Sequence, residues 1–211
     1  ESGFFIFAGE EPHRNVESYA EAFLDVVAEL GVWRVAFLGG VHAPMPYDVD
    51  RQVSCTYSHA AMKEELTRYA VRFSNYEGGV TIGTYLVHRA EARGIEVVAF
   101  YAMVPSYVFS RSSVHVQRMA MDNDHKAWYD LMRRLNFMFG LGIDLSELKE
   151  RSDTLISSMN SELDELDTNM PQLKVKAYLE ALASEFTEKP FMPLDDLWER
   201  ELKDLLDDEE D

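Results

Sequence analysis

The run IEVVAFYAMV at Ile95–Val104 is the most strand-like stretch of this 211-residue chain. Its β-branched and aromatic residues are typical of a strand buried on both faces. We expect it to end in a loop, Pro105-Ser106-Tyr107, because proline interrupts a hydrogen-bonded ladder. The segments on either side of this run alternate between short apolar runs and helical periodicity. This alternation predicts an α/β fold.

Upstream of this run, the first forty residues predict strand, helix, strand. GFFIFA at Gly3–Ala8 is a continuous apolar run, which predicts a buried strand. Asn15 can cap a helix whose apolar positions recur from Val16 to Leu30 at helical spacing. VWRVAFL at Val32–Leu38 predicts a second buried strand, closed by Gly39-Gly40. Together these segments predict a right-handed crossover between parallel strands.

The remaining segments up to residue 142 give weaker patterns. We interpret them as a strand at Arg51–Tyr57, a helix at His59–Tyr69, a strand at Val71–Asn75, a turn at Gly78-Gly79, and helices at Thr81–Arg93 and Asp124–Phe139. Residues 1–142 are therefore predicted to form a three-layer α/β/α body with a mostly parallel sheet.

The character of the chain changes after Gly140-Leu141-Gly142. Apolar residues recur from Leu145 to Leu166 and again from Val175 to Phe186, which predicts two long helices in an antiparallel hairpin. A short final helix is expected around residues 194–206. Residues 143–206 would then form a C-terminal helical region, and residues 207–211 an acidic disordered tail. The apolar stripes of the hairpin need a cover, and we expect oligomerisation to supply part of it.

The charge balance excludes several classes of function. The chain has 38 acidic and 20 basic residues, and its formal net charge is −18. Two stretches, Asp144–Met170 at −6 and Asp195–Asp211 at −8, carry most of the excess. A chain of this charge repels nucleic-acid phosphates, so no nucleic-acid partner is expected.

No apolar run reaches the ~18 residues of a membrane span, so no membrane association is expected. No signal peptide is recognisable, and we expect a cytoplasmic protein. The single Cys55 excludes an internal disulfide and a cysteine-rich zinc site.

A reactive centre is not recognisable in the sequence. There is no G-x-S-x-G motif, and Cys55 lacks the basic neighbours that would activate its thiol. The six histidines are dispersed without metal-ligand spacing, and Asp122-Asn123-Asp124 fits a helix start better than a metal site. We therefore expect neither metal nor cofactor, and the sequence favours a protein that is not an enzyme.

An alternative is a small-molecule-binding protein or hydrolase. Its site would lie between the loops 42–48, 78–83 and 105–107, which could converge at one end of the sheet. The Gly78–Gly83 stretch, GGVTIG, leads into a helix N-terminus and could bind an anionic or polar ligand, although it lacks the lysine of a phosphate-binding loop. The candidate ligand-binding residues are His42, Asp48, Gly78, Gly79, Gly83 and Tyr107, with His42 and Asp48 as the titratable groups and Tyr107 as a hydrogen-bonding wall.

The order of the motifs resembles the proteasome assembly chaperone 2 family. The matching features are Gly9-Glu10-Glu11-Pro12 after the first strand, the strand ending in Gly39-Gly40, YEGGVTIG at Tyr76–Gly83, VPSYV at Val104–Val108, and GLGIDL at Gly140–Leu145. The resemblance covers residues 3–186 and is closest to the bacterial branch. It implies a body similar to the phosphorylase/hydrolase-like fold. It also implies homo-oligomers, with trimers expected for that branch.

The resemblance implies that the protein works through protein–protein contacts, since archaeal and eukaryotic members help proteasome α-subunits to assemble. Two departures from the family bear on this. The chain ends Glu209-Glu210-Asp211, whereas docking members end in a hydrophobic residue, tyrosine and any residue, so that docking mode is not expected. The family also begins with a further strand, so we expect a segment to precede Glu1. The first hypothesis is thus a non-catalytic, assembly-chaperone-like homo-oligomer that binds itself and another protein.

Overall fold

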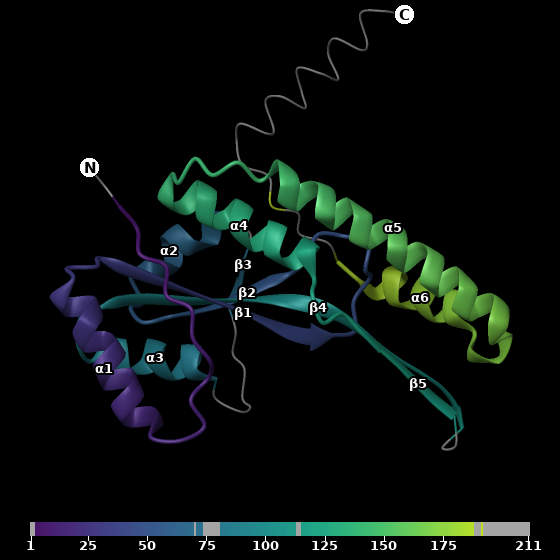
Figure 1. Cartoon of the computed structure of the whole chain (residues 1–211), viewed down its shortest axis with the longest axis horizontal. Coiled ribbons are helices and arrows are strands. Elements are labelled where there is room, and N and C mark those ends of the chain that lie inside the picture. The colour runs from purple at the N-terminus through teal and green to yellow at the C-terminus, as the bar shows by residue number, and fades with distance from the viewer. Residues whose placement is uncertain (1–2, 70, 74–80, 113–114, 188–190, 192–211) are drawn as a thin grey trace, which may run out of the picture. The chain divides into compact units, whose positions relative to one another are not determined.

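The chain folds around one mixed sheet. The computed structural model describes residues 3–69, 71–73, 81–112, 115–187 and 191. Its helices are α1 (Val16–Glu29), α2 (Met62–Leu66), α3 (Ile82–Glu91), α4 (His125–Phe139), α5 (Ser146–Asn169) and α6 (Val175–Glu185), with 3-10 turns at η1 (Thr67–Tyr69) and η2 (Pro171–Leu173). Its strands are β1 (Arg34–Ala43), β2 (Val53–Tyr57), β3 (Val71–Phe73), β4 (Glu96–Ser112) and β5 (His115–Ala120). The predicted α/β class, with a central open sheet flanked by helices and with C-terminal helices, is confirmed (Figure 1).

The strand-like run at the centre of the sequence is also the centre of the sheet. In the described residues the strand order is β1-β4-β2-β3, and β5 pairs with β4. The first part of β4 is buried from Val97 to Ala102, which explains why this stretch is apolar without alternation. Because Gln52 pairs with Met103 while Ser58 pairs with Val97, β2 runs antiparallel to β4. The sequence analysis predicted a mostly parallel sheet, whereas the β2–β4 pair and the β4–β5 pair are both antiparallel.

β4 is longer than predicted and passes straight through Pro105. The expected loop at residues 105–107 is therefore wrong, since these residues lie within the strand. Pro105 sits where β4 changes partner. Met103 still donates to Gln52 next to β2, whereas from Ser106 onward β4 is in register with β5, beginning opposite Ala120. A proline at such a junction breaks no essential ladder bond, because its missing N–H falls between the two pairings.

The predicted first strand is absent. Residues 3–8 belong to no strand, and Phe4, Phe5, Ile6 and Phe7 are 60%, 69%, 84% and 64% exposed. Phe7 packs edge-to-face on Phe23 of α1, with ring centroids 5.4 Å apart. An apolar run alone cannot distinguish a strand from a segment that packs by single side chains on a helix, which is why this prediction was wrong.

The predicted end of the next strand at Gly39-Gly40 is also wrong, because β1 continues to Ala43. Gly40 does not end the strand, and it allows β1 and β4 to approach each other closely. A Cβ at this position would lie 3.3 Å from the Val104 side chain of the neighbouring strand β4. The absence of a side chain at Gly40 therefore lets the two strands pair past this point.

By its internal contacts the chain divides into two compact units, and β1, β2, β3 and β4 each contribute residues to both. The first unit comprises residues 1–39, 55–65 and 73–100, and the second residues 40–54, 66–72 and 101–211. In the first unit, α1 packs against α3, and Leu24 and Leu86 are buried there. Arg34 at the start of β1 donates to both Glu65, at 2.6 Å, and Glu96, at 2.8 Å.

In the second unit, α4 and α5 lie side by side (Figure 1). The turn between them needs positive φ at Gly140 (+58°) and Gly142 (+64°), a conformation that favours glycine. The Asn136 side chain closes this turn, because its amide donates to the Ile143 carbonyl and its oxygen accepts from the Ile143 amide. The predicted hairpin of α5 and α6 is confirmed. The expected final helix and acidic tail lie outside the described residues.

Within the part of the chain that the structure describes, no helix combines the length and apolar character needed to cross a bilayer.

Candidate functional site

The predicted site residues that the structure describes are divided between the two units. Asp48 and Tyr107 belong to the second unit, where the charge of Asp48 contributes to raising the pKa of Tyr107. His42 lies in β1 with an exposed side chain, and not in a loop. Gly83 is buried in α3 of the first unit. Gly78 and Gly79 lie outside the described residues.

The predicted anion site at the start of α3 has a protein ligand of its own. The Ile82 amide donates to the Glu11 carboxylate at 2.8 Å, and the Thr84 amide donates to the Thr81 hydroxyl at 3.3 Å. A carboxylate near a helix N-terminus interacts favourably with the helix dipole. An anionic ligand at this helix end would therefore have to compete with Glu11.

Tyr107 is a buried residue of the second unit whose hydroxyl and ring both make contacts inside that unit. It is 1% exposed, its hydroxyl donates to the Met45 carbonyl at 2.9 Å, and its ring packs near those of Phe109 and Tyr178. Burial raises the pKa of Tyr107 well above its usual value. The Tyr107 hydroxyl thus holds the loop that begins at Met45, and the role of Tyr107 as the hydrogen-bonding wall of a ligand site stays a prediction.

The same loop is held by a buried arginine that the sequence analysis did not single out. Arg51 is fully buried, and its Nε donates to Asp124 Oδ2 at 2.7 Å. Its Nη1 donates to the carbonyls of Tyr47 and Val49 at 2.9 and 3.0 Å. Asp124 also caps α4 by accepting from the Ala127 amide at 3.0 Å, which confirms the predicted helix start. Arg51 therefore ties residues 47–51 to the N-terminus of α4.

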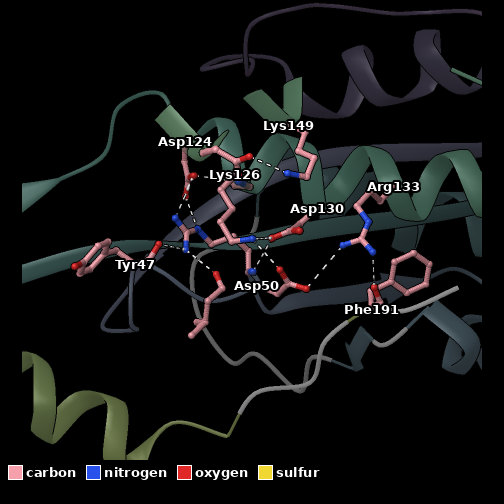
Figure 2. A network of polar contacts seen from close by, with 12 residues as sticks. Tyr47, Asp50, Asp124, Lys126, Asp130, Arg133, Lys149 and Phe191 are labelled. Carbon is pink, nitrogen blue, oxygen red and sulfur yellow. Dashed lines mark hydrogen bonds and ion pairs between the residues drawn. The ribbon is translucent and has the colours of Figure 1, made fainter. Parts of the chain in front are cut away.

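A second group of charges lies beside this clamp (Figure 2). Lys126 lies 2.8 Å from Asp50 and 3.6 Å from Asp130, and Arg133 lies 3.9 Å from Asp50. Asp130 Oδ2 accepts from the Arg51 amide at 2.7 Å, and burial is the main cause that raises the pKa of Asp130. These ion pairs and this hydrogen bond join the groups into one network. Nothing in the spacing of these residues along the chain could have revealed it.

A shallow pocket lies between α5, α6 and the loop that Arg51 holds. It is lined by Tyr47, Asn160, Leu163, Asp164, Val175, Lys176, Leu179 and Glu180, and we call it the α5–α6 pocket.

The chemistry of this pocket combines an apolar floor with an acidic rim. Leu163 is 4% exposed and Val175 is fully buried, whereas Asp164 is 66% exposed. The lining has two carboxylates, Asp164 and Glu180, and one basic side chain, Lys176, which lies 3.0 Å from Asp164. Burial, followed by the charges of Asp48 and Asp164, raises the pKa of Tyr47, whose hydroxyl bonds to Asn160. The negative rim disfavours anions and suits an apolar or cationic side chain.

Among the residues that the structure describes, no three histidine, cysteine, aspartate or glutamate side chains are grouped as metal ligands. Burial raises the pKa of the Cys55 thiol to about 12, which leaves it protonated at neutral pH.

Comparison with known proteins connects the fold to one family. A family model described as the PAC2 family matches residues 1–163. A search of the curated proteins finds no match.

Three solved structures illustrate the likeness, and at these identities they show the fold alone. A PAC2 family protein from Streptomyces avermitilis is 23% identical, with a TM-score of 0.63, over 76% of this chain and 63% of that chain. A Mycobacterium tuberculosis proteasome-assembly chaperone homologue is 22% identical, with a TM-score of 0.59, over 72% and 58%. Pyrococcus furiosus PbaA, an archaeal homologue of proteasome-assembly chaperone, is 15% identical, with a TM-score of 0.55, over 82% and 65%. This chain therefore spans less than two thirds of the length of each.

Proposed function

The chain belongs to the PAC2 family, and from this premise we propose that it is a non-catalytic, assembly-chaperone-like protein that binds another protein and acts as a homo-oligomer. The observation that carries the proposal is the exposed apolar segment at residues 4–7. Four consecutive large side chains there are 60–84% exposed. A contiguous apolar patch of this kind on a protein surface marks a contact for another protein.

The names of the structural neighbours support the same class of function. The Mycobacterium tuberculosis and Pyrococcus furiosus proteins are named as homologues of proteasome-assembly chaperone. By extension, the partner proposed here is a protein subunit that is bound while its own interface is still uncovered. Apolar side chains are suited to that role, because an unassembled subunit exposes apolar surface that its assembled form buries.

The test compares two variants that each place serine on an exposed apolar position. Phe5→Ser combined with Ile6→Ser removes the centre of the segment, and Met170→Ser, at a position that is 40% exposed, is the matched control. Affinity capture from the native host, quantified by mass spectrometry, should recover a defined set of proteins with the wild type and the control. The double variant should lose that set, and an undiminished set would count against the segment as the contact.

Homo-oligomerisation is tested separately by light scattering over a range of protein concentrations. The expected result is a mass that is a multiple of the chain mass. A wild-type protein that stays monomeric at every concentration would contradict the homo-oligomer.

A second candidate function, small-molecule binding or hydrolysis, is supported by one observation. Asp48 and Tyr107 lie in the same unit as the α5–α6 pocket, and the charge of Asp48 acts on both Tyr47 and Tyr107. For this candidate, the wild type should show thermal shifts with one class of metabolite in a panel. Asp48→Ala combined with His42→Ala should abolish those shifts, and identical shifts in both proteins would argue against this site.

A further inference from the structure

The second half of β4 and the whole of β5 form a two-stranded ribbon, which we call the β4–β5 arm (residues 106–112 and 115–120). Its antiparallel register runs from Ser106 opposite Ala120 to Ser112 opposite His115, and Figure 1 shows the two strands side by side. A two-stranded ribbon is only marginally stable in water by itself. The arm therefore needs contacts beyond its own ladder.

One face of the arm already has such contacts. Tyr107 and Phe109 are buried, and both rings meet Tyr178 of α6 edge-on, with centroids 6.1 and 5.2 Å away. The intervening residue, Val108, points to the opposite face and is 51% exposed. Its cross-strand neighbour is Arg118, which is also exposed. This second face of the arm, with Val108 and Arg118, is apolar and basic.

The charge of the arm differs from that of the rest of the chain. Residues 97–121 contain no aspartate or glutamate, but they contain Arg111, Arg118 and His115, in a chain whose net charge is −18. Within the described residues, Arg118 makes no ion pair. The arm is therefore a basic element attached to an acidic protein, and it is attracted to acidic surfaces.

The α5–α6 pocket has the complementary character. Its apolar floor, which includes Leu163 and Leu179, can cover the aliphatic stem of an arginine. The carboxylate of Glu180, together with that of Asp164 beside Lys176, can receive the guanidinium. Arginine is the side chain best suited to such a site, because its planar guanidinium binds carboxylates in a bidentate manner.

We propose that the β4–β5 arm of one copy docks into the α5–α6 pocket of a second copy, with Arg118 directed to Glu180 and Asp164. The proposal rests on the homo-oligomer proposed above and names the surfaces that form it. The occupant is a second copy because the same chain carries both complementary surfaces, each of which is accessible.

The first experiment is a charge-reversal cycle, read out as the dissociation constant of self-association in analytical ultracentrifugation at low salt. Arg118→Glu and Glu180→Arg should each raise the dissociation constant about tenfold or more. The combined variant, Arg118→Glu with Glu180→Arg, should recover most of the wild-type value, because the ion pair is then restored with its charges exchanged. Arg14→Glu, an exposed reversal in the other unit, is the matched control and should change little.

The outcomes separate this inference from the homo-oligomer itself. If the wild type self-associates but both single reversals leave its dissociation constant unchanged, the arm–pocket contact is wrong and the homo-oligomer stands. If the wild type does not self-associate, the homo-oligomer fails and the docking proposal fails with it. If the combined variant is no better than the single variants, Arg118 and Glu180 do not meet.

A second measurement is independent of interaction energies. Arg118→Cys protein mixed with Glu180→Cys protein should form an interchain disulfide under mild oxidation, whereas Arg14→Cys mixed with Glu180→Cys should not. Cys55 is buried and does not compete. Equal cross-linking in both mixtures would overturn the proposal.

Discussion

The most consequential single residue in the second unit is Arg51, a fully buried cation. The desolvation of a guanidinium costs several kcal/mol, and this cost is offset only when the charge is paired and its donors are satisfied. Asp124 pairs it at 2.7 Å, two backbone carbonyls accept from its Nη1, and its Nη2 donates to Asp124 Oδ1 at 3.4 Å. Arg51 and Asp124 are therefore expected to stabilise the fold only as a pair.

Replacement of Arg51 by leucine should lower the free energy of unfolding by about 3–5 kcal/mol, because Asp124 would then be buried without its counter-charge. Equilibrium urea denaturation measures this loss. Arg93→Ala is the control, because Arg93 pairs with Glu21 and Asp25 at the surface, and the expected loss is below about 1 kcal/mol. Equal losses in the free energy of unfolding would show that the buried Arg51–Asp124 pair stabilises the fold no more than an exposed ion pair.

Cys55 illustrates how burial controls reactivity at a single residue. Its side chain is 1% exposed, and burial raises the pKa of the thiol to about 12. A raised pKa means less thiolate at a given pH, and the thiolate is the nucleophile.

The folded protein should therefore react very slowly with iodoacetamide between pH 7 and pH 9. In denaturant the same thiol should react at the rate of an ordinary cysteine, whose pKa is ~8.5. Mass spectrometry of the alkylated protein measures both rates. Rapid alkylation of the folded protein at pH 8 would contradict the burial of this thiol.

At the scale of elements, α5 and α6 were predicted well because each carries a long apolar periodicity. The junction between α5 and α6 shows a feature that periodicity does not report. Lys174 follows η2, is the N-cap residue of α6, and has φ of +52°, in the left-handed region. A residue other than glycine or asparagine is strained in this conformation, and in a left-handed helix the cost is roughly 1–2 kcal/mol per residue.

Lys174→Gly should therefore raise the free energy of unfolding by about 0.5–1 kcal/mol. The matched control is Ala177→Gly, at an exposed position inside α6, which should lower it by about 1 kcal/mol. Thermal or urea denaturation of the two variants gives the sign directly. A destabilising Lys174→Gly change would mean that the lysine side chain contributes more than the strain it bears.

At the scale of the whole molecule, the excess of negative charge sets how stability responds to salt. The net charge is −18. The exposed ion pairs, such as Lys149–Asp153 and Arg151–Glu147 on α5, are each worth little in water. Repulsion among the excess carboxylates therefore dominates the response, and salt screens that repulsion.

Raising sodium chloride from 20 to 200 mM should increase the Tm, by ~2–4 °C for each kcal/mol of repulsion removed. The measurement is best made by calorimetry on the Arg118→Glu variant at low micromolar concentration, so that self-association does not contribute. Potassium chloride at the same ionic strength should have the same effect. A Tm that falls with salt would show that attractive ion pairs outweigh the net repulsion.

The amino-acid sequence by itself determined the α/β class, the central strand at residues 95–104, the helix start at Asp124 and the α5–α6 hairpin. These features depend on local periodicity and capping, which act over a few residues. The tertiary structure alone decided that β4 continues past Pro105 to pair with β5, that residues 3–8 form no strand, and that Arg51 meets Asp124 across 73 positions of the chain. A strand or a charge takes the partner that folding brings beside it, and no local pattern records which partner that is.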